Sequence, residues 1–296
     1  MKIVKIYESI LDIASPYEGI LLDAYGVFWG GNAIGVFPGA KETMQELVSR
    51  GKIVGILSNA TQLPSAEMEK IGKQGLLLGS HFHFYVTSGE VAKAVFLRGQ
   101  LPFPTPKKKY FLFSKIHPKY SSPYVLFEKS LFEETKNIEE ADFIYLPTPH
   151  LQGEDQTDPE LFRELVKDIL PYKIPMVCAN PDRFAHEGSP ARAVVRQGSI
   201  AAFYEEFGGE VFYIGKPSVL SFSAAMREFH KHGITDPAKI LMVGDTPETD
   251  IKGALNFGMD SALIIETGIM KDRSIDLHSS ETPTYFIKRL ASHAAV

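Results

Sequence analysis

The chain has 296 residues, more than one compact domain usually holds and enough for two. Hydrophobic residues make up 44% of it and charged residues 23%, and no apolar run is long enough to cross a bilayer. The net charge of -5 gives no electrostatic reason to expect a nucleic acid or an acidic membrane as a partner. We therefore expect a soluble globular protein.

The first residues of the chain mix charged and apolar side chains at helical spacing. They have neither the long apolar stretch nor the small-residue cleavage site of a secretory signal, so we expect a cytoplasmic protein. The single cysteine, Cys178, excludes an intramolecular disulfide and a cysteine-rich metal site. It stands in the apolar run IPMVC and is expected to be a buried structural thiol.

Short apolar runs alternate with segments of helical periodicity along the chain. This alternation is typical of a mostly parallel sheet with helices on both faces, which is a doubly wound, Rossmann-like α/β core. Helices are predicted from Ala40 to Arg50, between Pro38 and Gly51, and from Ser218 to His230. The best strand candidates are Gly19 to Leu22, Lys52 to Leu57, Val211 to Ile214, Lys239 to Val243 and Ser261 to Ile265.

A long segment separates the first two of these strands from the other three. It has strand-like runs of its own at 110–113, 141–146 and 174–178, interrupted by proline-rich and polar stretches. It is therefore predicted to be a second α/β domain inserted into the first. We place the boundaries near Gly89 and near Gly208 and Gly209. Residues 1–88 and 209–296 would then form the core, and residues 89–208 the insert.

Polar residues stand at or just beyond the ends of four predicted core strands: Asp23, Ser58, Lys216 and Asp245. Open parallel sheets bind ligands at the carboxyl ends of their strands. Taken singly, each residue has an ordinary explanation, because an aspartate after a strand is commonly a helix cap and a lone lysine is commonly a surface residue. Their shared placement favours a functional site.

Four segments resemble, in order and spacing, the signature motifs of the haloacid dehalogenase (HAD) superfamily. They are GILLDAYGV (19–27), ILSNA (56–60), YIGKPS (213–218) and LMVGDTPETD (241–250). The GKPS form of the third motif, PGA after the first strand and TSG at 87–89 resemble the class IIA branch. That branch carries its cap between the second and third motifs and includes nitrophenyl phosphate, phosphoglycolate and pyridoxal phosphate phosphatases. The resemblance implies a magnesium-dependent hydrolase with a C2-type cap that acts on a small phosphorylated metabolite.

The resemblance also implies a role for each motif residue. Asp23 would attack phosphorus to give an aspartyl-phosphate that water then hydrolyses. Ser58, Asn59 and Lys216 would bind the phosphate and offset its developing charge. Mg²⁺ prefers oxygen ligands. Its ligands would be the carboxylates of Asp23, Asp245 and Asp250 and the backbone carbonyl of Tyr25.

Tyr25 departs from the family pattern, because phosphatases of this superfamily usually carry a second aspartate there as general acid and base. General acid-base catalysis contributes on the order of 10² to 10⁴ in rate, and a phenol with a pKa of about 10 is a poor base at neutral pH. Three hypotheses remain open. In the first, the protein is a phosphatase that either acts on a substrate whose leaving group needs no protonation or recruits another side chain as the acid. In the second, it is a catalytically weak metabolite- or phosphate-binding protein. In the third, it is a dehalogenase, because the segment DAYG resembles the matching segment of dehalogenases. Asp245 and Asp250 disfavour the dehalogenase, because a metal-free site would crowd like charges.

The stretch from Asn180 to Ser199 resembles the class IIA cap loop that descends over the core site. Its candidate substrate-binding residues are Asn180, Asp182, Arg183 and His186. One of the arginines of the same stretch, Arg183, Arg192 or Arg196, could grip a second anionic group with its planar fork. The alternative is a polar surface loop. A homodimer is expected by resemblance alone.

Overall fold

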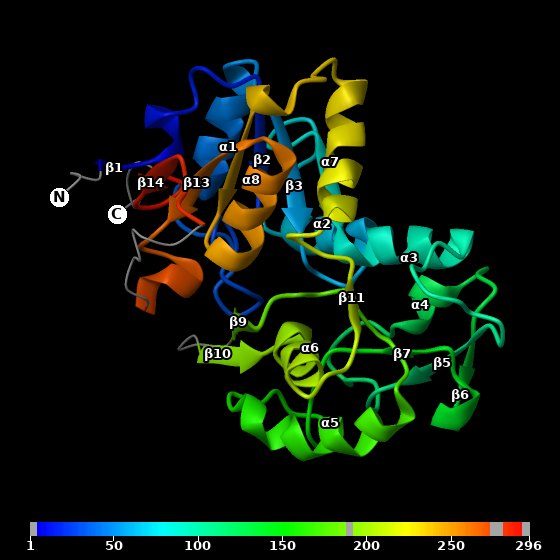
Figure 1. Ribbon diagram of the computed structural model, residues 1–296. Helices are drawn as coiled ribbons and strands as arrows, with labels where there is room; N and C mark the ends of the chain where they lie inside the picture. The colour runs from blue at the N-terminus through cyan, green and yellow to red at the C-terminus, as the bar shows by residue number, and fades with distance from the viewer. Residues whose placement is uncertain (1–4, 188–191, 273–280, 292–296) are drawn as a thin grey trace.

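The computed structural model describes residues 5–187, 192–272 and 281–291. The chain forms two α/β parts that lie one above the other (Figure 1). Both ends of the chain contribute to the upper part, and the segment between them forms the lower part. The predicted class, a doubly wound parallel α/β core with an inserted α/β domain, is confirmed.

The core is a seven-stranded sheet in which every neighbouring pair is parallel. From edge to edge its strands are β1 (Ile6–Tyr7), β14 (Tyr285–Ile287), β13 (Asp260–Ile264), β12 (Ile240–Gly244), β2 (Gly19–Leu22), β3 (Ile53–Ser58) and β4 (Phe84–Thr87). The chain runs outward from β2 to β4 and later returns to β12 on the other side of β2. The strand order therefore reverses between β2 and β12, which is where such sheets open a crevice for ligands.

Helices cover both faces of the core sheet because successive side chains of a buried strand point to opposite faces. Ile20 and Leu22 of β2 pack into the cluster that holds Met44 of α1, whereas Leu21 packs into the cluster that holds Phe229 of α7. The first face carries α1 (Ala40–Ser49) and α2 (Pro64–Gly72). The second carries α3 (Ser88–Arg98), α7 (Val219–Lys231) and α8 (Lys252–Phe257).

The insert has a five-stranded parallel sheet of its own. In order across the sheet the strands are β11 (Val211–Tyr213), β8 (Met176–Cys178), β7 (Phe143–Tyr145), β5 (Lys109–Leu112) and β6 (Glu133–Thr135). Its helices are α4 (Tyr124–Phe127), α5 (Arg163–Ile169) and α6 (Gln197–Glu206). An antiparallel pair, β9 (Phe184–Glu187) and β10 (Arg192–Val195), lies between this sheet and the core (Figure 1).

Short helical turns complete the described chain. They are η1 (Ile10–Asp12), η2 (Ile138–Glu140), η3 (Pro159–Phe162), η4 (Leu170–Tyr172), η5 (Pro237–Lys239) and η7 (Gly268–Asp272), with one π-helical turn, η6 (Pro247–Ile251). Within the described ranges, no helix is long and apolar enough to cross a membrane.

The strand at Val211–Tyr213 lies in a different sheet from the one expected. We predicted it in the core, but it pairs with β8 of the insert. The boundary placed at Gly208 and Gly209 therefore falls before the last strand of the insert rather than at its end. A short apolar run suits either sheet equally, and its sequence does not say which neighbour it will pair with.

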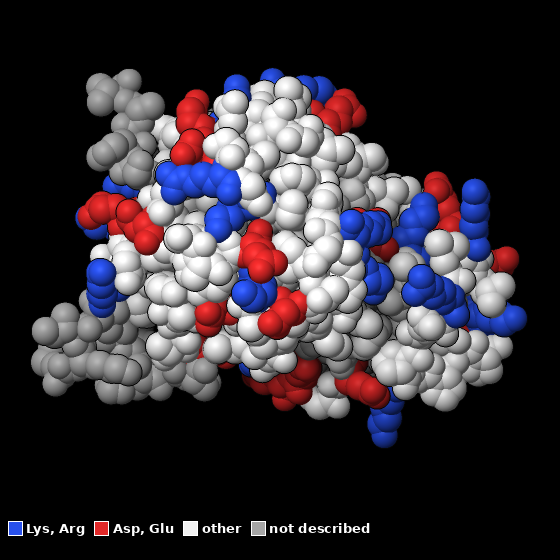
Figure 2. Space-filling view, turned by 90° about the horizontal axis from the view of Figure 1, so that it is seen from above, with Lys and Arg blue, Asp and Glu red and all other residues white. Residues whose placement is uncertain are grey.

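Charged side chains on the outer face of the core are of both signs. Figure 2 shows lysine and arginine interspersed with aspartate and glutamate over the described part of this face.

Candidate active site

Two neighbouring core strands deliver an aspartate to the point where the strand order reverses. Asp23 follows β2 and Asp245 follows β12, and these two strands are paired. The backbone N–H of Asp23 donates to the carbonyl of Val243 at 2.9 Å, so the ladder continues to the last residue before the loop. Both aspartates are buried. The predicted gathering of these residues at one edge of the sheet is present.

Lys216 lies between two of the carboxylates. Its Nζ is 2.6 Å from Asp23 Oδ1 and 2.7 Å from Asp250 Oδ1. The lysine is 1% exposed and Asp250 is fully buried. Lys216 does not follow a core strand, as we had expected, but stands on the link by which the chain leaves β11 and returns to the core. Its backbone N–H donates to Asn59 Oδ1 at 2.7 Å, which fixes that link against the core.

The loop after β12 turns back so that Asp250 joins Asp245. Asp245 Oδ2 accepts the N–H of Ile269 at 2.7 Å, and its Oδ1 accepts the hydroxyl of Thr246 at 2.8 Å. Asp250 Oδ2 accepts the N–H of Thr246 at 3.1 Å. A Cβ at Gly26 would lie 2.0 Å from Asp245 Oδ2, and its φ is +78°. Only glycine fits there, because the position requires a left-handed backbone beside a buried carboxylate.

The electrostatics of the cluster reflect more carboxylates than cations. Burial raises the pKa of Asp23 well above its ordinary range, and Lys216 only partly opposes this. Burial and the nearby Asp250 raise the pKa of Asp245 to about 7. Burial raises the pKa of Asp182 to about 6. Burial alone would lower the pKa of Lys216, but the carboxylates around it outweigh that effect, so it lies above the usual value and the lysine is charged.

The donor set fits a divalent cation. Asp23, Asp245 and Asp250 each offer a carboxylate oxygen, and these atoms all lie within 4.8 Å of one another. Buried carboxylates at this spacing repel one another, and Lys216 is the single cation that contacts them among the described residues. Carboxylate oxygen is also the ligand that Mg²⁺ prefers. A divalent cation would supply the missing positive charge.

Asn59 ties the insert to the core beside this cluster. Its Nδ2 donates to Asp182 Oδ1 at 2.8 Å, and its Oδ1 accepts the N–H of Lys216 and the hydroxyl of Ser88, the latter at 3.1 Å. Asp182 comes from the predicted cap loop, so the loop reaches the core as expected. The side chain of Asn59 is engaged within the protein. Ser58 is buried, and its Oγ accepts the N–H of Ala60 at 3.2 Å.

A cavity of about 500 Å³ opens between the core and the insert, and Asp23, Ser58 and Asp245 line it. Three of the predicted cap residues, Asn180, Asp182 and His186, line the same cavity. Arg183 does not. It is exposed and lines a neighbouring cavity on the other side of the loop, together with Lys252 and Glu248. Residues 188–191 of the predicted cap loop lie outside the described residues.

The side chain of Tyr25 is held at the wall of this cavity. Its hydroxyl accepts a hydrogen bond from Lys70 Nζ at 2.9 Å, and Lys70 also pairs with the buried Glu67 at 2.7 Å. The Lys70 ammonium lies 5.2 Å from the centre of the Tyr25 ring and 5.6 Å from that of Trp29. Burial raises the pKa of Tyr25 well above its ordinary value. The phenol is therefore neutral and is no base at physiological pH.

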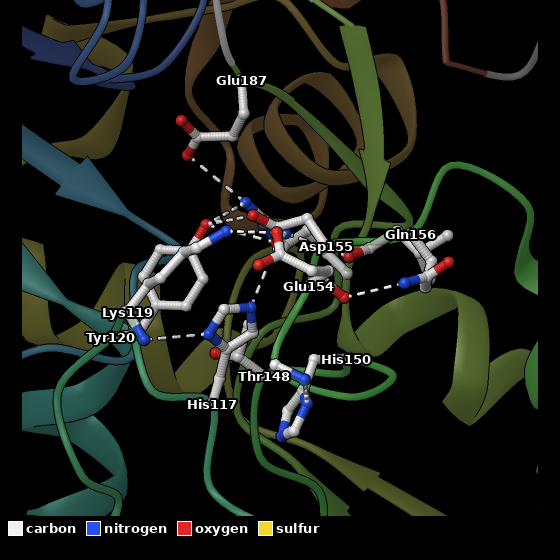
Figure 3. Close-up of polar contacts among 12 residues, drawn as sticks. His117, Lys119, Tyr120, Thr148, His150, Glu154, Asp155, Gln156 and Glu187 are labelled. Carbon is white, nitrogen blue, oxygen red and sulfur yellow. Dashed lines mark hydrogen bonds and ion pairs between the residues drawn. The ribbon is translucent and has the colours of Figure 1, made fainter.

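The wall contributed by the insert contains a buried guanidinium. Arg196 is 6% exposed and contacts Asp155 at 3.0 Å, the hydroxyl of Tyr120 at 3.1 Å and Glu187 at 3.3 Å. Figure 3 shows this cluster, in which His117 lies on the side of Asp155 and Glu187 stands apart, joined by one contact. Tyr120, Glu187 and Arg196 all line the cavity that holds Asp23.

Sequence reasoning missed Lys70, Glu67, Tyr120, Asp155 and Glu187. Glu67 and Lys70 stand three residues apart on α2, a spacing that brings side chains together on a helix. That spacing was an available signal for the pair, although not for its burial. Tyr120 and Asp155 come from loops of the insert, and their meeting with Arg196 depends on long-range packing that leaves no local pattern.

Two stretches of the chain match known families. Residues 20–136 match the family described as haloacid dehalogenase-like hydrolase, and residues 213–293 match the one described as HAD-hydrolase-like. The first stretch contains Asp23 and Ser58, and the second contains Lys216, Asp245 and Asp250. The chain belongs to the haloacid dehalogenase-like hydrolases. This confirms the predicted family.

Relatives of this HAD-like hydrolase align along nearly its whole length. Chronophin from Rattus norvegicus is 26% identical over 96% of this chain and 89% of its own. A 4-nitrophenylphosphatase from Schizosaccharomyces pombe is 24% identical over 98% of this chain and 96% of its own. The crystal structure of a haloacid dehalogenase-like hydrolase from Brucella suis 1330 has the same fold. Its TM-score is 0.78 at 24% identity, covering 97% of this chain and 100% of that one. The inserted domain and these relatives agree with subfamily IIA.

Proposed function

We propose that the protein is a magnesium-dependent phosphatase that hydrolyses small phosphorylated metabolites through an aspartyl-phosphate on Asp23. The observation that carries this proposal is the meeting of Asp23, Lys216, Asp245 and Asp250 at the end of the cavity, where the sheet reverses its strand order. The name of the Schizosaccharomyces pombe relative, a 4-nitrophenylphosphatase, supports phosphate esters as the substrate class.

The roles of the side chains follow from their positions. An Asp23 carboxylate oxygen attacks phosphorus while the bond to the leaving oxygen breaks, and the phosphoryl group is then held on Asp23. Water attacks the same phosphorus, the bond to Asp23 breaks, and the free carboxylate returns. The Lys216 ammonium, the Ser58 hydroxyl and the backbone N–H of Asn59 offset charge on the phosphoryl oxygens. The side chain of Asn59 positions Lys216 and Asp182 instead.

The proposed magnesium ligands are Asp23, Asp245 and Asp250, with the backbone carbonyl of Tyr25. When bound, the ion would neutralise charge on the phosphoryl oxygens. The chain's own contribution is to hold three carboxylates together before the ion arrives. Thr246 and Ile269 hold Asp245 and Asp250, and Lys216 holds Asp23. Asn180, Asp182 and His186 are proposed to contact the substrate from the cap, because they line the cavity.

Tyr25 determines which phosphate esters we expect to react fastest. No carboxylate stands two residues after Asp23, and the Tyr25 phenol is held neutral against Lys70. Esters whose leaving group departs without a proton should therefore react fastest. A catalytically weak phosphate-binding protein is the second candidate, favoured by the same substitution.

Phosphate release from 4-nitrophenyl phosphate tests the proposal. Wild-type protein with Mg²⁺ should release phosphate, and neither the Asp23→Asn variant nor wild type with a chelator should do so. If hydrolysis of the phospho-enzyme is slow, 4-nitrophenol should appear in a burst whose size equals the amount of enzyme. Binding of phosphate without release above the Asp23→Asn control would support the binding protein and reject the phosphatase. Release of halide from a haloacid without metal would support the dehalogenase.

A further inference from the structure

The Arg196 guanidinium has little capacity left for a ligand. It donates from Nη1 to Asp155 and to the carbonyl of Val195, and from Nη2 to Tyr120 and to Glu187. A guanidinium has five N–H donors, so four of them are engaged within the protein. A substrate anion could bind here only by displacing a buried partner. The expectation that Arg196 grips a second anionic group does not fit this geometry.

The cluster around Arg196 has an excess of negative charge. Two carboxylates, Asp155 and Glu187, face one guanidinium. His117 lies 3.6 Å from Asp155, but burial lowers its pKa below 6.5, so it adds no positive charge near neutral pH. With both carboxylates ionised, the cluster carries about one net negative charge, and its cavity side is formed by Tyr120, Arg196 and Glu187. Burial raises the pKa of Glu187, and the Arg196 guanidinium opposes this shift.

The lysines of the cavity wall do not cancel the negative charge of this cluster. Lys70 pairs with Glu67 at 2.7 Å, and both line the cavity. Lys119 pairs with Glu154 at 2.5 Å, and both side chains are more than half exposed. Lys271 also lines the cavity and is exposed to solvent, which screens its charge.

Of the two carboxylates that pair with Arg196, Glu187 is the one that lines the cavity. Its Oε1 contacts Arg196, whereas its Oε2 accepts no hydrogen bond from any residue that the structure describes. A Cβ at Gly31 would lie 3.0 Å from that Oε2, so the carboxylate lies close to the core loop that contains Gly31. A free acceptor held in place by a buried guanidinium is suited to bind a hydroxyl or an ammonium group.

We propose that Glu187 makes the cavity select phosphate esters whose alcohol part is uncharged or cationic and carries hydrogen-bond donors, and reject those with a second anionic group. This inference rests on the proposed phosphatase function, because it names the substrate class of that site. Glu187 acts on the leaving part of the ester, away from the phosphoryl group, and takes no part in bond breaking.

Three phosphate esters of similar size test the proposal: glycerol 3-phosphate, phosphoethanolamine and 3-phosphoglycerate. Their dissociation constants are measured by calorimetry at pH 8 with Mg²⁺ on the Asp23→Asn variant, which cannot form the phospho-enzyme. The first two should bind about tenfold more tightly than 3-phosphoglycerate, because an unscreened charge several ångströms away has an effect of this size. Equal or tighter binding of 3-phosphoglycerate, or no binding of any of the three at millimolar concentration, would overturn the proposal.

Variants identify the residue responsible. Added to the same background, Glu187→Gln should reduce the preference at least threefold, and Glu187→Asp should keep its direction. Glu154→Gln is the matched control, because it removes the same charge from a residue of the cluster in Figure 3 that does not line the cavity. An unchanged preference in Glu187→Gln would reject Glu187. A preference for the anion that Lys271→Met abolishes would assign the selection to Lys271.

The experiments distinguish a failure of the phosphatase proposal from a failure of the proposed role of Glu187. Phosphate release from 4-nitrophenyl phosphate by the wild type tests the phosphatase, and the 4-nitrophenyl group carries no net charge in the bound ester. Charge selection without release would reject the phosphatase and retain the binding preference. Release without charge selection would retain the phosphatase and reject the role of Glu187.

Discussion

The hydroxyl of Tyr25 accepts a hydrogen bond from Lys70 Nζ at 2.9 Å, at the wall of the cavity that contains Asp23. This contact occupies the phenol oxygen, and burial keeps its proton in place. The side chain that stands where the family pattern led us to expect an aspartate is therefore fixed in a role that involves no proton transfer. This contact, two further contacts of the site and one at the distant edge of the sheet each lead to a measurable expectation.

Replacing Tyr25 with aspartate should raise phosphatase turnover. A carboxyl group at this position can give a proton to the leaving oxygen and take one from water, which typically contributes on the order of 10² to 10⁴ in rate. Turnover numbers for 4-nitrophenyl phosphate and for an alkyl phosphate are compared, and the alkyl ester should gain more because its leaving group is more basic. Tyr25→Phe is the control, and it should gain for neither ester. Equal gains for both esters would contradict general acid catalysis as the reason.

Replacing Lys216 with methionine should destabilise the protein by about 3–5 kcal/mol, because Asp23 and Asp250 would remain buried without their cation. Urea unfolding without divalent ions measures the effect. The Asp23→Asn, Lys216→Met double variant should recover part of the loss, since one of the unpaired charges is gone. Lys231→Met, which removes an exposed pair with Glu228, should cost no more than about 1 kcal/mol. Similar losses for the two lysines would show that the buried pairing has little energetic weight.

Magnesium should raise the melting temperature of the wild type, because an ion that binds only the folded state stabilises it by about 2.7 kcal/mol at a hundred times its dissociation constant. Asp245→Asn should respond much less to magnesium. Without the ion, this variant should be more stable than the wild type, because it removes one of three adjacent buried charges and keeps an acceptor for Ile269. Calorimetry with and without Mg²⁺ measures both effects. A variant that gains as much as the wild type from magnesium would argue against Asp245 as a ligand.

Stability should fall as the pH decreases below about 6.5, in part through His83. The backbone N–H of Val54 donates to His83 Nδ1 at 3.0 Å, and burial together with His232 lowers the pKa of His83 from 6.5. The unfolded chain therefore takes up this proton first, so the contribution of His83 is fully present above pH 6.5 and is lost as the pH falls through the folded pKa. His83→Asn keeps an acceptor for Val54 and should flatten the pH dependence of the unfolding free energy in that window. The same change at the exposed His230 is the control, and an equal flattening there would contradict the assignment.

Much of the core could be predicted from the sequence because its strands are buried on both faces. Gly19–Leu22 was predicted with the bounds that the structure shows, and the strands ending near Ser58 and Gly244 were predicted to within a residue. A continuous apolar run bounded by polar residues is a strong signal for such strands. The meeting of Asp23 with Asp245 followed from the shared direction of parallel strands.

What the sequence could not show was the pairing of elements far apart in the chain. The run Val211–Tyr213 is apolar and short, so it fits either sheet. Its pairing with β8 places it in the sheet of the insert. The sequence does not show whether an arginine is buried, so Arg196 could be counted as a free cation and Glu187 could be overlooked. Arg183, thirteen residues earlier in the same predicted loop, points to another cavity. Burial, rather than residue type, separates the two arginines.

The route of the chain between β11 and Lys216 limits how the two parts can separate. Tyr213 and the N–H of Ile214 are bound to the sheet of the insert, and Lys216 is bound to the core through Asn59 and Asp23, so at most two residues link the two parts there. Two residues reach only about 7 Å when extended. The phosphate end of the cavity, where Lys216 holds Asp23, therefore lies at a short tether between the two parts, and a separation of more than a few ångströms there would break the contacts of Lys216.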